Sequence, residues 1–456
     1  MEINEVVELQ RQYFETNQTK DVNFRLAKLK ELKNNIIAMQ SQICEALKQD
    51  LGKSSTESYM AEIGMVLSEL NYIIKHLKNW AKPDKVKTPL NNFTAKSFIT
   101  YEPFGVVLVI APWNYPFLLS LDPVIGAICA GNCVVLKPSK EAPNVGKVIK
   151  ELLSNTLEDK YVYTMLGSSF ANQVILEQKY DYIFFTGGKR VGRIVASKAA
   201  ENLTPTSLEL GGKSPCIIDQ DSNLKLAAKR VAFGKFLNVG QTCIAPDYCL
   251  VHSSIKQEFL KLLKQEIALQ YSTDALNNND YGKIINQKQF EWLTSLINKE
   301  KVVYGGKTNP QTLKIEPTVL DNVILDDAVM QDEIFGPVLP IIEYNSLQEA
   351  LKIVKTFAKP LAFYLFTNNK AVQKFWLTNV SFGGGCINDC IMHIANLHLP
   401  FGGVGDSGMG KYHGKQSFLT FSNMRSVVKQ SKKLDLPIRY QPYTKTKNKL
   451  IKTFMK

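Results

Sequence analysis

The first 80 residues carry apolar side chains at the three- and four-residue spacing of amphipathic helices. The pattern is plain in FRLAKLKELKNNIIAM and in EIGMVLSELNYIIKHLKNW. Since residues at these spacings share one face of a helix, this region is predicted to be a set of helices that pack through one side. Pro83 ends it, and NFTAKSFITY at 92–101 then alternates apolar and polar residues as a half-exposed strand does.

From residue 102 the pattern changes to short apolar runs rich in β-branched and aromatic residues, with stretches compatible with helices between several of them. Strands that alternate with helices predict a parallel sheet buried on both faces. A second α/β region follows from about 210 to 424, and SVVKQSKK after residue 425 predicts another strand. The first runs are VVLVIAPW (106–113), NCVVLKPS (132–139), DYIFFTGG (181–188) and SPCIIDQ (214–220).

Composition fits an ordinary folded chain, with 45% apolar and 21% charged residues over 456 positions. That length allows two or three domains. No run of eighteen apolar residues is present, so no membrane-spanning helix is predicted. The N-terminus lacks the basic head and apolar run of a secretory signal, and we therefore expect a cytoplasmic protein.

The formal net charge of +13 raises the question of an anionic partner. Lysines occur along the whole chain, and the one dense patch is the C-terminal stretch YTKTKNKLIKTFMK. Scattered charge favours a solvated, lysine-rich surface over one that binds nucleic acid, because it forms no continuous site. Contact of the basic tail with a membrane surface or a phosphate-bearing partner is the alternative.

Eight cysteines are present, and one of them stands out by its surroundings. Their spacings match neither a disulfide framework nor a metal-binding finger, so no metal site is predicted. Most should be small buried apolar residues, as Cys129 is within IGAICAG. Cys243 instead lies in the glycine-containing segment GKFLNVGQTCIAPD, directly after a polar Gln–Thr pair, and is a candidate nucleophile.

Thirty-four residues before Cys243, Glu209 interrupts a short apolar strand in TSLELGGKSP. A carboxylate is costly to bury unless it is paired or used, and taking a proton from water is one such use. The alternative is that Glu209 pairs with Lys213 in an ordinary turn.

The usual GxGxxG fingerprint is absent, but Gly187 and Gly192 of FFTGGKRVG follow a predicted strand. They could admit a pyrophosphate at a helix N-terminus or form a plain turn.

Seven motifs together make the chain resemble the aldehyde dehydrogenase superfamily. In order and spacing they are APWNYP, KPSK, FFTGG followed by VG, LELGGKSP, GQTC, EIFGP and PFGGVGDSGMG. They span some 300 residues, so the resemblance covers nearly the whole chain. The short start before the first helix and the end RYQPYTKTKNK are similar to the short, class 3 type of this family.

The resemblance implies an α/β fold of three parts and, as in most members of this class, a homodimer. The three expected parts are a Rossmann-like parallel-sheet cofactor domain (1–80 and 102–209), an α/β catalytic domain (210–424) and a small β oligomerisation element (81–101 and 425–436). A basic tail (437–456) follows them.

Three residues acquire roles in the oxidation of an aldehyde to a carboxylic acid through this resemblance. The Cys243 thiolate would attack the aldehyde carbon. The side-chain amide of Asn114 and the backbone N–H of Cys243 would hold the oxyanion, and each such donor is typically worth about 3 kcal/mol. After hydride transfer to NAD or NADP, Glu209 would activate the water that hydrolyses the thioester.

The cofactor and substrate positions also come from the resemblance. Lys137 would contact the adenosine ribose. The turn from Gly187 to Gly192 would lie at the adenine and pyrophosphate. Glu333 and Phe335 would hold the nicotinamide ribose and ring. The cofactor set is Trp113, Lys137, Lys140, Gly187, Gly188, Gly192, Glu333 and Phe335. The substrate set, whose apolar character suits medium- or long-chain aliphatic or aromatic aldehydes, is Tyr115, Leu119, Phe233, Thr242, Ile391 and Ile394.

Two positions depart from the pattern of many relatives. Lys140 stands where they have an acid that binds the ribose hydroxyls and repels a 2′-phosphate. The reversed charge predicts that NADP is tolerated or preferred, unless Lys140 points to solvent. Gly188 stands where they have Ser, which would loosen the adenine side of the site.

Two rival functions are weighed against this one. A CoA-acylating aldehyde dehydrogenase would keep the cysteine but would not need a water-activating carboxylate, so Glu209 argues against it. A basic-surface binding protein on the same fold would be expected to have lost Cys243, Glu209 or Asn114, and all three are present.

Overall fold

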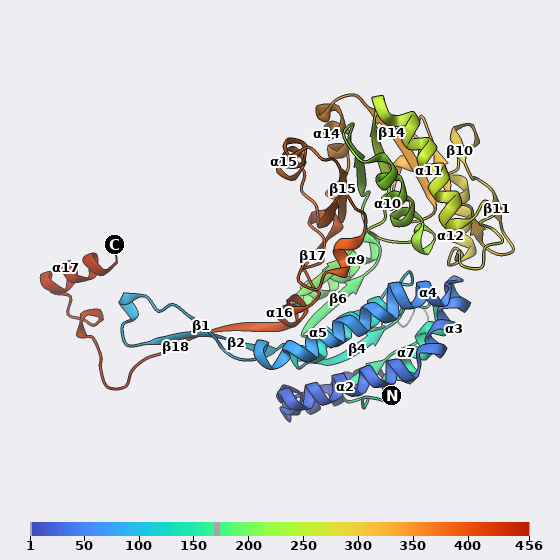
Figure 1. Cartoon of the computed structure of the whole chain (residues 1–456). Coiled ribbons are helices and arrows are strands. Elements are labelled where there is room, and N and C mark those ends of the chain that lie inside the picture. Colours follow the sequence, from blue (N-terminus) through green and yellow to red (C-terminus); the bar gives the residue numbers. More distant parts are fainter. Residues whose placement is uncertain (1, 168–173, 456) are drawn as a thin grey trace.

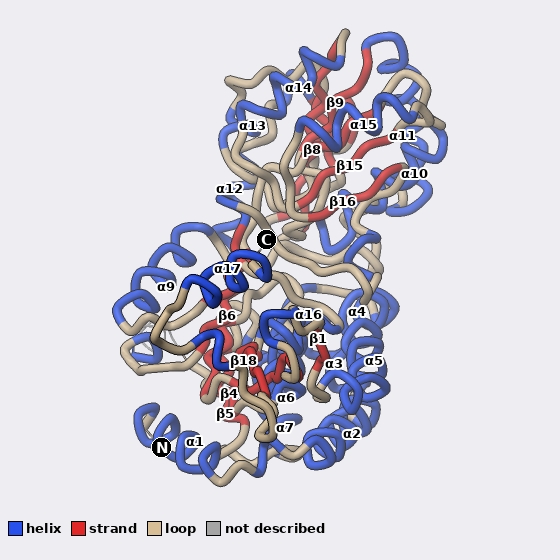
Figure 2. Tube along the Cα trace, turned by 90° about the vertical axis from the view of Figure 1, so that its left-hand side faces the viewer, coloured by secondary structure: helices blue, strands red, loops and turns tan. Residues whose placement is uncertain are grey.

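The computed structural model describes residues 2–167 and 174–455 and shows two lobes, each built around a β-sheet, with an arm that projects from them (Figure 1). A view turned by 90° separates the two lobes along the length of the molecule (Figure 2). The chain begins in the first lobe and ends on the arm. Over the described ranges, no helix combines the length and the hydropathy that crossing a bilayer requires.

The first lobe contains a six-stranded sheet with the order β17-β7-β6-β3-β4-β5. Strands β3 to β7 pair in parallel, and β17 lies antiparallel beside β7. The central strands are buried and rich in valine, isoleucine and phenylalanine, as a sheet covered on both faces requires. The strands are β3 (Val106–Ile110), β4 (Cys133–Lys137), β5 (Val162–Thr164), β6 (Tyr182–Thr186), β7 (Thr206–Glu209) and β17 (Gly408–Met409).

Helices cover this sheet, and the predicted helical region at the start of the chain is confirmed as α1 to α5. The strongly apolar α6 is buried along its whole length. The helices of this lobe are α1 (Ile3–Glu15), α2 (Val22–Ala38), α3 (Gln40–Leu51), α4 (Ser55–Ser58), α5 (Gly64–Trp80), α6 (Leu118–Ala130), α7 (Pro143–Ser154), α9 (Lys189–Glu201) and α16 (Lys415–Thr420).

The second lobe contains a seven-stranded sheet with the order β10-β13-β14-β9-β8-β15-β16. Its strands are β8 (Pro215–Ile218), β9 (Tyr248–His252), β10 (Val302–Tyr304), β13 (Thr318–Leu320), β14 (Val338–Tyr344), β15 (Ala362–Phe366) and β16 (Gly384–Ile387), with a separate ribbon of β11 (Thr308–Asn309) and β12 (Lys314–Ile315). Its helices are α10 (Leu224–Phe236), α11 (Lys256–Tyr271), α12 (Gln287–Ser295), α13 (Ala328–Gln331), α14 (Leu347–Thr356) and α15 (Lys370–Asn379).

The arm contains a three-stranded antiparallel sheet, β1 (Asp84–Val86), β2 (Lys96–Pro103) and β18 (Ser422–Lys429), and beyond it the helix α17 (Lys445–Phe454). The predicted α/β fold, with two sheets rich in parallel strands and a small antiparallel one, is confirmed. One segment within 210–424 returns to the first lobe. There β17 pairs with β7, and α16 packs on α6.

Candidate active site

A cavity of about 970 Å³ is lined by residues of both lobes. Its first-lobe wall is formed by the turns that follow β3, β6 and β7, which carry Asn114, Gly187 and Glu209. The carboxyl ends of adjacent parallel strands are the usual place for a ligand in such sheets. The second lobe contributes Cys243 from the loop after α10.

The loop that carries Cys243 has a strained backbone. After α10, Asn238, Val239 and Gly240 all have positive φ, of 52°, 56° and 73°. Glycine is required at the third position, because a Cβ on Gly240 would lie 2.3 Å from the carbonyl oxygen of Gly336. A residue other than glycine keeps a positive φ only when the surrounding structure holds it there. Such strained residues are common at active sites.

Hydrogen bonds within the loop and to the first lobe hold this loop in place. The Asn238 backbone N–H donates to Glu57 Oε1 at 3.0 Å. Its side-chain amide donates to the carbonyl oxygens of Asn114 at 2.8 Å and Gln241 at 3.1 Å. Lys53 Nζ donates to the same Asn114 oxygen at 3.1 Å. The backbone of Asn114 is thereby fixed relative to the loop that carries Cys243.

Cys243 is half-buried and faces the cavity. Burial, together with the nearby carboxylates Glu333 and Glu209, raises the pKa of its thiol to about 12, although the backbone N–H groups of Cys243 and Ile244 donate toward the sulfur and oppose the shift. The thiol is therefore protonated at rest, and its proton must leave when the sulfur attacks.

Glu209 lies at the end of β7 and is buried, with neither carboxylate oxygen hydrogen-bonded within the described part of the chain. Burial raises the pKa of this carboxyl well above its ordinary value, and the Lys411 ammonium opposes the shift. The alternative that Glu209 pairs with Lys213 is wrong. Lys213 Nζ lies 2.6 Å from Asp247 Oδ2, and it also donates to the carbonyl of Val329.

Asn114 is buried at the cavity wall. Its side-chain nitrogen donates to the Gln241 carbonyl oxygen at 3.1 Å, which fixes the amide plane. An amide nitrogen carries two hydrogens, so this bond leaves one donor for a group within the cavity.

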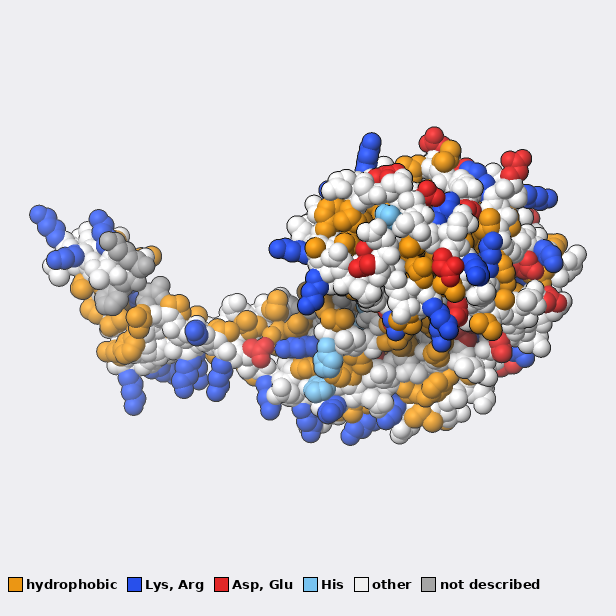
Figure 3. Space-filling view, turned by 45° about the horizontal axis from the view of Figure 1, so that its top comes forward, with side chains coloured by type: hydrophobic (Ala, Val, Ile, Leu, Met, Phe, Trp, Pro, Cys, Tyr) orange, Lys and Arg blue, Asp and Glu red, His pale blue; other side chains and the backbone are white. Residues whose placement is uncertain are grey.

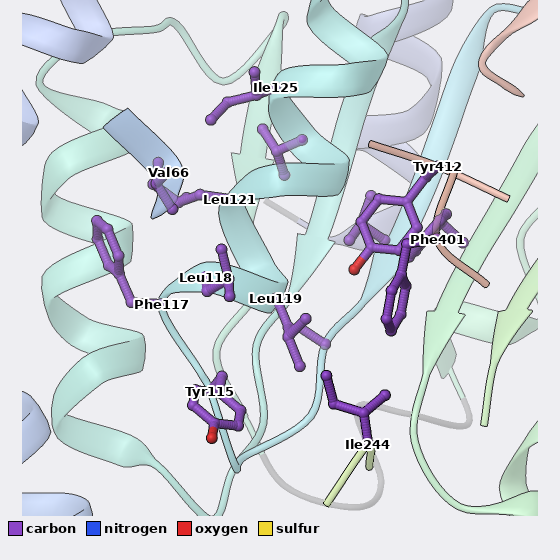
Figure 4. Packing of buried hydrophobic residues seen from close by; sticks show 14 of the residues in the cluster. Val66, Tyr115, Phe117, Leu118, Leu119, Leu121, Ile125, Ile244, Phe401 and Tyr412 are labelled. Atoms are coloured by element: carbon purple, nitrogen blue, oxygen red, sulfur yellow. The ribbon is translucent and has the colours of Figure 1, made fainter. Parts of the chain in front are cut away.

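All six residues expected in the substrate pocket line the cavity. Tyr115 and Thr242 also hydrogen-bond each other, at 2.6 Å. Figure 4 shows Leu119, Ile244, Phe401 and Tyr412 converging from separate segments. Sequence reasoning missed the last three, although Phe401 begins the FGGVG motif. It also missed the wall residues Met60, Met65, Leu118, Leu237, Trp292, Phe357 and Met392.

The expected cofactor residues divide into two groups. Trp113, Gly187, Gly188, Glu333 and Phe335 line the cavity, and the Trp113 and Phe335 rings meet edge to face. Lys137, Lys140 and Gly192 are not on its wall. Lys137 is buried and donates to the Pro138 carbonyl at 3.0 Å. Gly192 packs on Leu210, where a Cβ would lie 2.7 Å from Cδ2. Lys140 is half-exposed, 3.7 Å from Glu141.

The turn before α9 fits a phosphate-bearing cofactor. A Cβ added to Gly188 would meet nothing within 4 Å, so this wall of the cavity is open. The helix begins directly after it and has no acidic residue in its first turn. The free N–H groups and partial positive charge of a helix N-terminus favour a pyrophosphate there.

Fold and cavity define a two-sheet α/β enzyme with a cofactor cleft. Residues 1–427 match the model of the aldehyde dehydrogenase family. The chain is 47% identical to the 4,4′-diaponeurosporen-aldehyde dehydrogenase of Staphylococcus aureus, over 97% of each chain. It is 42% identical to the rat "aldehyde dehydrogenase, dimeric NADP-preferring", over 94% of this chain and 95% of the relative.

Solved structures agree. The substrate-bound state of Staphylococcus aureus AldH superposes with a TM-score of 0.98 at 46% identity, covering 100% of this chain and 99% of that one. Betaine aldehyde dehydrogenase from the same species, in complex with NAD+, gives 0.84 at 25% identity, covering 96% and 88%. The chain therefore belongs to the aldehyde dehydrogenase family. It is an NAD(P)-dependent oxidoreductase that oxidises aldehydes.

Proposed function

We propose that the chain oxidises an apolar aldehyde to the carboxylic acid through a covalent intermediate on Cys243. The observation that supports this most is the meeting of three polar groups in one cavity. The thiol of Cys243, the carboxyl of Glu209 and the amide of Asn114 come from three separate segments and line the same space. A nucleophile, a base and an oxyanion donor are the parts that acyl chemistry needs.

The steps follow from these groups. The Cys243 sulfur attacks the aldehyde carbon as its proton passes to water, and the Asn114 amide and the Cys243 backbone N–H stabilise the oxygen that becomes negative. The hydride acceptor for this carbon would be supplied by bound NAD(P). Glu209 in its ionised form then takes a proton from water, which attacks the thioester and releases the acid.

NAD(P) would be held by the part of the cavity wall that contains Gly188, where no side chain fills the space. The Gly187–Gly188 turn and the start of α9 would hold the pyrophosphate, and Glu333 and Phe335 the nicotinamide ribose and ring. In the part of the chain expected to bind cofactor, residues 1–80 and 102–209, the turns after β3 and β6 line this cavity. Residues 210–424 supply the nucleophile loop.

The substrate class is inferred from the walls. The six pocket residues and the additional Phe401, Met60 and Trp292 are mostly apolar, which suits a medium- or long-chain aliphatic or an aromatic aldehyde. A panel should therefore include such aldehydes beside 4,4′-diaponeurosporen-aldehyde, after which a 47% identical relative is named.

We also infer a homodimer. The arm exposes apolar side chains on one face of its sheet, including Met424 (61% exposed) and Val428 (55% exposed). A contiguous exposed apolar face is typical of a surface that another chain covers. The rat relative is itself named as dimeric.

The mechanism is tested by trapping the intermediate. Glu209→Gln should release one equivalent of NADH in a burst and then turn over about a thousandfold more slowly, because water is no longer activated. Intact mass should find the acyl group on the protein, and Cys243→Ala should show neither burst nor adduct. Full turnover by Glu209→Gln would overturn the role of Glu209. Faster release with CoA, yielding acyl-CoA, would favour the acylating alternative.

The choice of cofactor is tested at Lys140. Lys140→Glu should raise the NAD/NADP ratio of kcat/KM roughly tenfold, because an acid there repels a 2′-phosphate. Lys150→Glu changes the charge equally on the exposed side of α7 and should leave the ratio unchanged. An unchanged ratio in Lys140→Glu would mean that this side chain points to solvent and does not act on the bound cofactor.

A further inference from the structure

The positive charge of the molecule is concentrated on the arm. Residues 82–103 and 422–455 contain thirteen of the 55 Lys and Arg but only three of the 42 Asp and Glu, so they carry a formal charge of +10 out of +13. Figure 3 shows Lys and Arg side chains along the lower edge of the arm, beside patches of hydrophobic ones. The even scatter of lysines along the sequence thus conceals a strong asymmetry in space.

The three acids of the arm are already engaged within it. Glu102 lies 2.8 Å from Arg425, and Asp435 lies 2.8 Å from Arg439. Asp84 accepts a hydrogen bond from the Tyr101 hydroxyl at 2.6 Å. The eleven lysines of the arm therefore keep their charge uncompensated by arm carboxylates.

Strand register divides the arm sheet into two different faces. Val428 lies opposite Ser97 and Val86, and Met424 lies opposite Tyr101, so one face carries most of the exposed apolar side chains, with Ser426 and Asp84 as its other polar members. On the other face Lys429 lies directly opposite Lys96, and Lys85 pairs with the position two residues further along β2, Phe98. We call the set Lys85, Lys96 and Lys429 the lysine face.

The lysine face carries an electrostatic cost. Like charges directly opposite each other on two strands destabilise the pair. All three lysines are exposed, and in the described residues none of them forms an ion pair with a carboxylate. A bound anionic surface would offset this repulsion.

The tail helix α17 has the same two-sided character. Lys445, Lys449 and Lys452 lie on one side, since they are spaced by four and three residues. Leu450 and Ile451 lie on the other, together with Lys447, which donates to the Tyr440 carbonyl. Next to it the chain exposes Tyr440 (46%) and Tyr443 (54%). Lysines combined with apolar and aromatic side chains on a short helix are typical of segments that bind at a bilayer interface.

We propose that the lysine face and α17 dock the enzyme on a membrane surface that contains anionic lipids. Eleven of the thirteen basic residues are lysines, which act as point charges toward phosphate headgroups, whereas planar, bidentate recognition favours arginine. The apolar face is the one suited to a second copy of the chain, so the lysine face stays available. Apolar aldehydes, the substrate class proposed above, concentrate in bilayers.

The test is flotation of the full-length protein with vesicles of phosphatidylcholine, alone or with an equal part of phosphatidylglycerol. The wild type should float with the mixed vesicles only, and less so as salt is raised. Replacing Lys85, Lys96 and Lys429 with Gln should lower the partition coefficient about a hundredfold, because each lysine near an anionic surface contributes about fivefold. The Lys→Arg version of the same variant should bind as the wild type does.

A matched control separates this surface from net charge. Lys225, Lys261 and Lys352 are exposed on helices of the second lobe, and their replacement with Gln should leave vesicle binding unchanged. Equal loss in both Gln variants, no wild-type binding to mixed vesicles, or tighter binding to a duplex oligonucleotide would overturn the proposal. All variants should keep the wild-type kcat/KM on a water-soluble aldehyde, and a failure of that assay alone would bear on the proposed reaction instead.

Discussion

At the scale of single residues, Lys411 is placed to control the charge of Glu209. A Cβ on Gly402 would lie 2.8 Å from Glu209 Oε1 and 3.0 Å from Lys411 Cδ, so the two side chains close around this glycine. Lys411 Nζ donates to the carbonyl oxygens of Gly383 and Gly402, which holds it there. Burial disfavours the carboxylate, and the ammonium favours it through its opposite charge.

Replacement of Lys411 with Met should shift the pH dependence of kcat. Glu209 acts as a base only when ionised, so activity rises with pH through its pKa. Without the ammonium that pKa rises further, and the rising limb moves to higher pH. We expect kcat near neutral pH to fall roughly tenfold and to recover in alkaline buffer. Lys411→Arg keeps the charge and should keep the profile, whereas coincident profiles for Met and wild type would exclude this role.

At the scale of elements, a buried ion pair joins the N-terminal helices to α6. Lys53 Nζ lies 2.5 Å from Glu62 Oε1, and both side chains are fully buried. The other oxygen, Glu62 Oε2, accepts hydrogen bonds from the backbone N–H groups of Phe117 at 2.8 Å and Leu118 at 3.2 Å, where α6 begins. Lys53 also holds the Asn114 carbonyl. The pair therefore fixes the segment that carries the proposed oxyanion donor.

Breaking this ion pair should lower both the stability of the protein and its kcat. Lys53→Met leaves the Glu62 charge buried without its partner, and we expect the free energy of unfolding to fall by about 3–5 kcal/mol. Urea unfolding measures this. Adding Glu62→Gln removes the stranded charge and should restore part of the stability. The kcat should stay low, because the Asn114 carbonyl has lost the hydrogen bond from Lys53 and keeps only the one from Asn238. If the double variant regained full kcat, the pair would matter for stability alone.

The sequence predicts those elements whose apolar and polar residues form a recognisable pattern within the element itself. The four named apolar runs became β3, β4, β6 and β8, and Cys243 and Glu209 stood out because their surroundings were unusual for their residue types. The two-residue strand β17 lies in a glycine-rich stretch without periodicity, and its pairing with β7 joins distant parts of the chain. Lys53 and Lys411 were missed for the same reason: their partners are defined only by the fold.

At the scale of the whole molecule, the two proposals assign a dimer contact to one face of the arm sheet and a membrane contact to the other. In the proposed dimer the exposed apolar side chains of one face would be covered, whereas the lysines of the other face oppose close approach of a second, equally charged arm. A dimer that buries the apolar face would leave both lysine faces outward. Two such faces would act together on a membrane and raise its apparent affinity for the enzyme.

The dimer contact is therefore expected to depend on Val428 and not on its neighbour Lys429. Val428→Asp places a charge in the apolar face, and burying it without a partner in the contact costs several kcal/mol, so the dissociation constant should rise by roughly a hundredfold or more. Light scattering after size exclusion, over a dilution series, should show the variant as a monomer where the wild type is a dimer. Lys429→Gln lies one position away, on the opposite face, and should dimerise as the wild type does. If Val428→Asp stayed dimeric throughout the series, a surface other than the arm sheet would have to hold the two copies together.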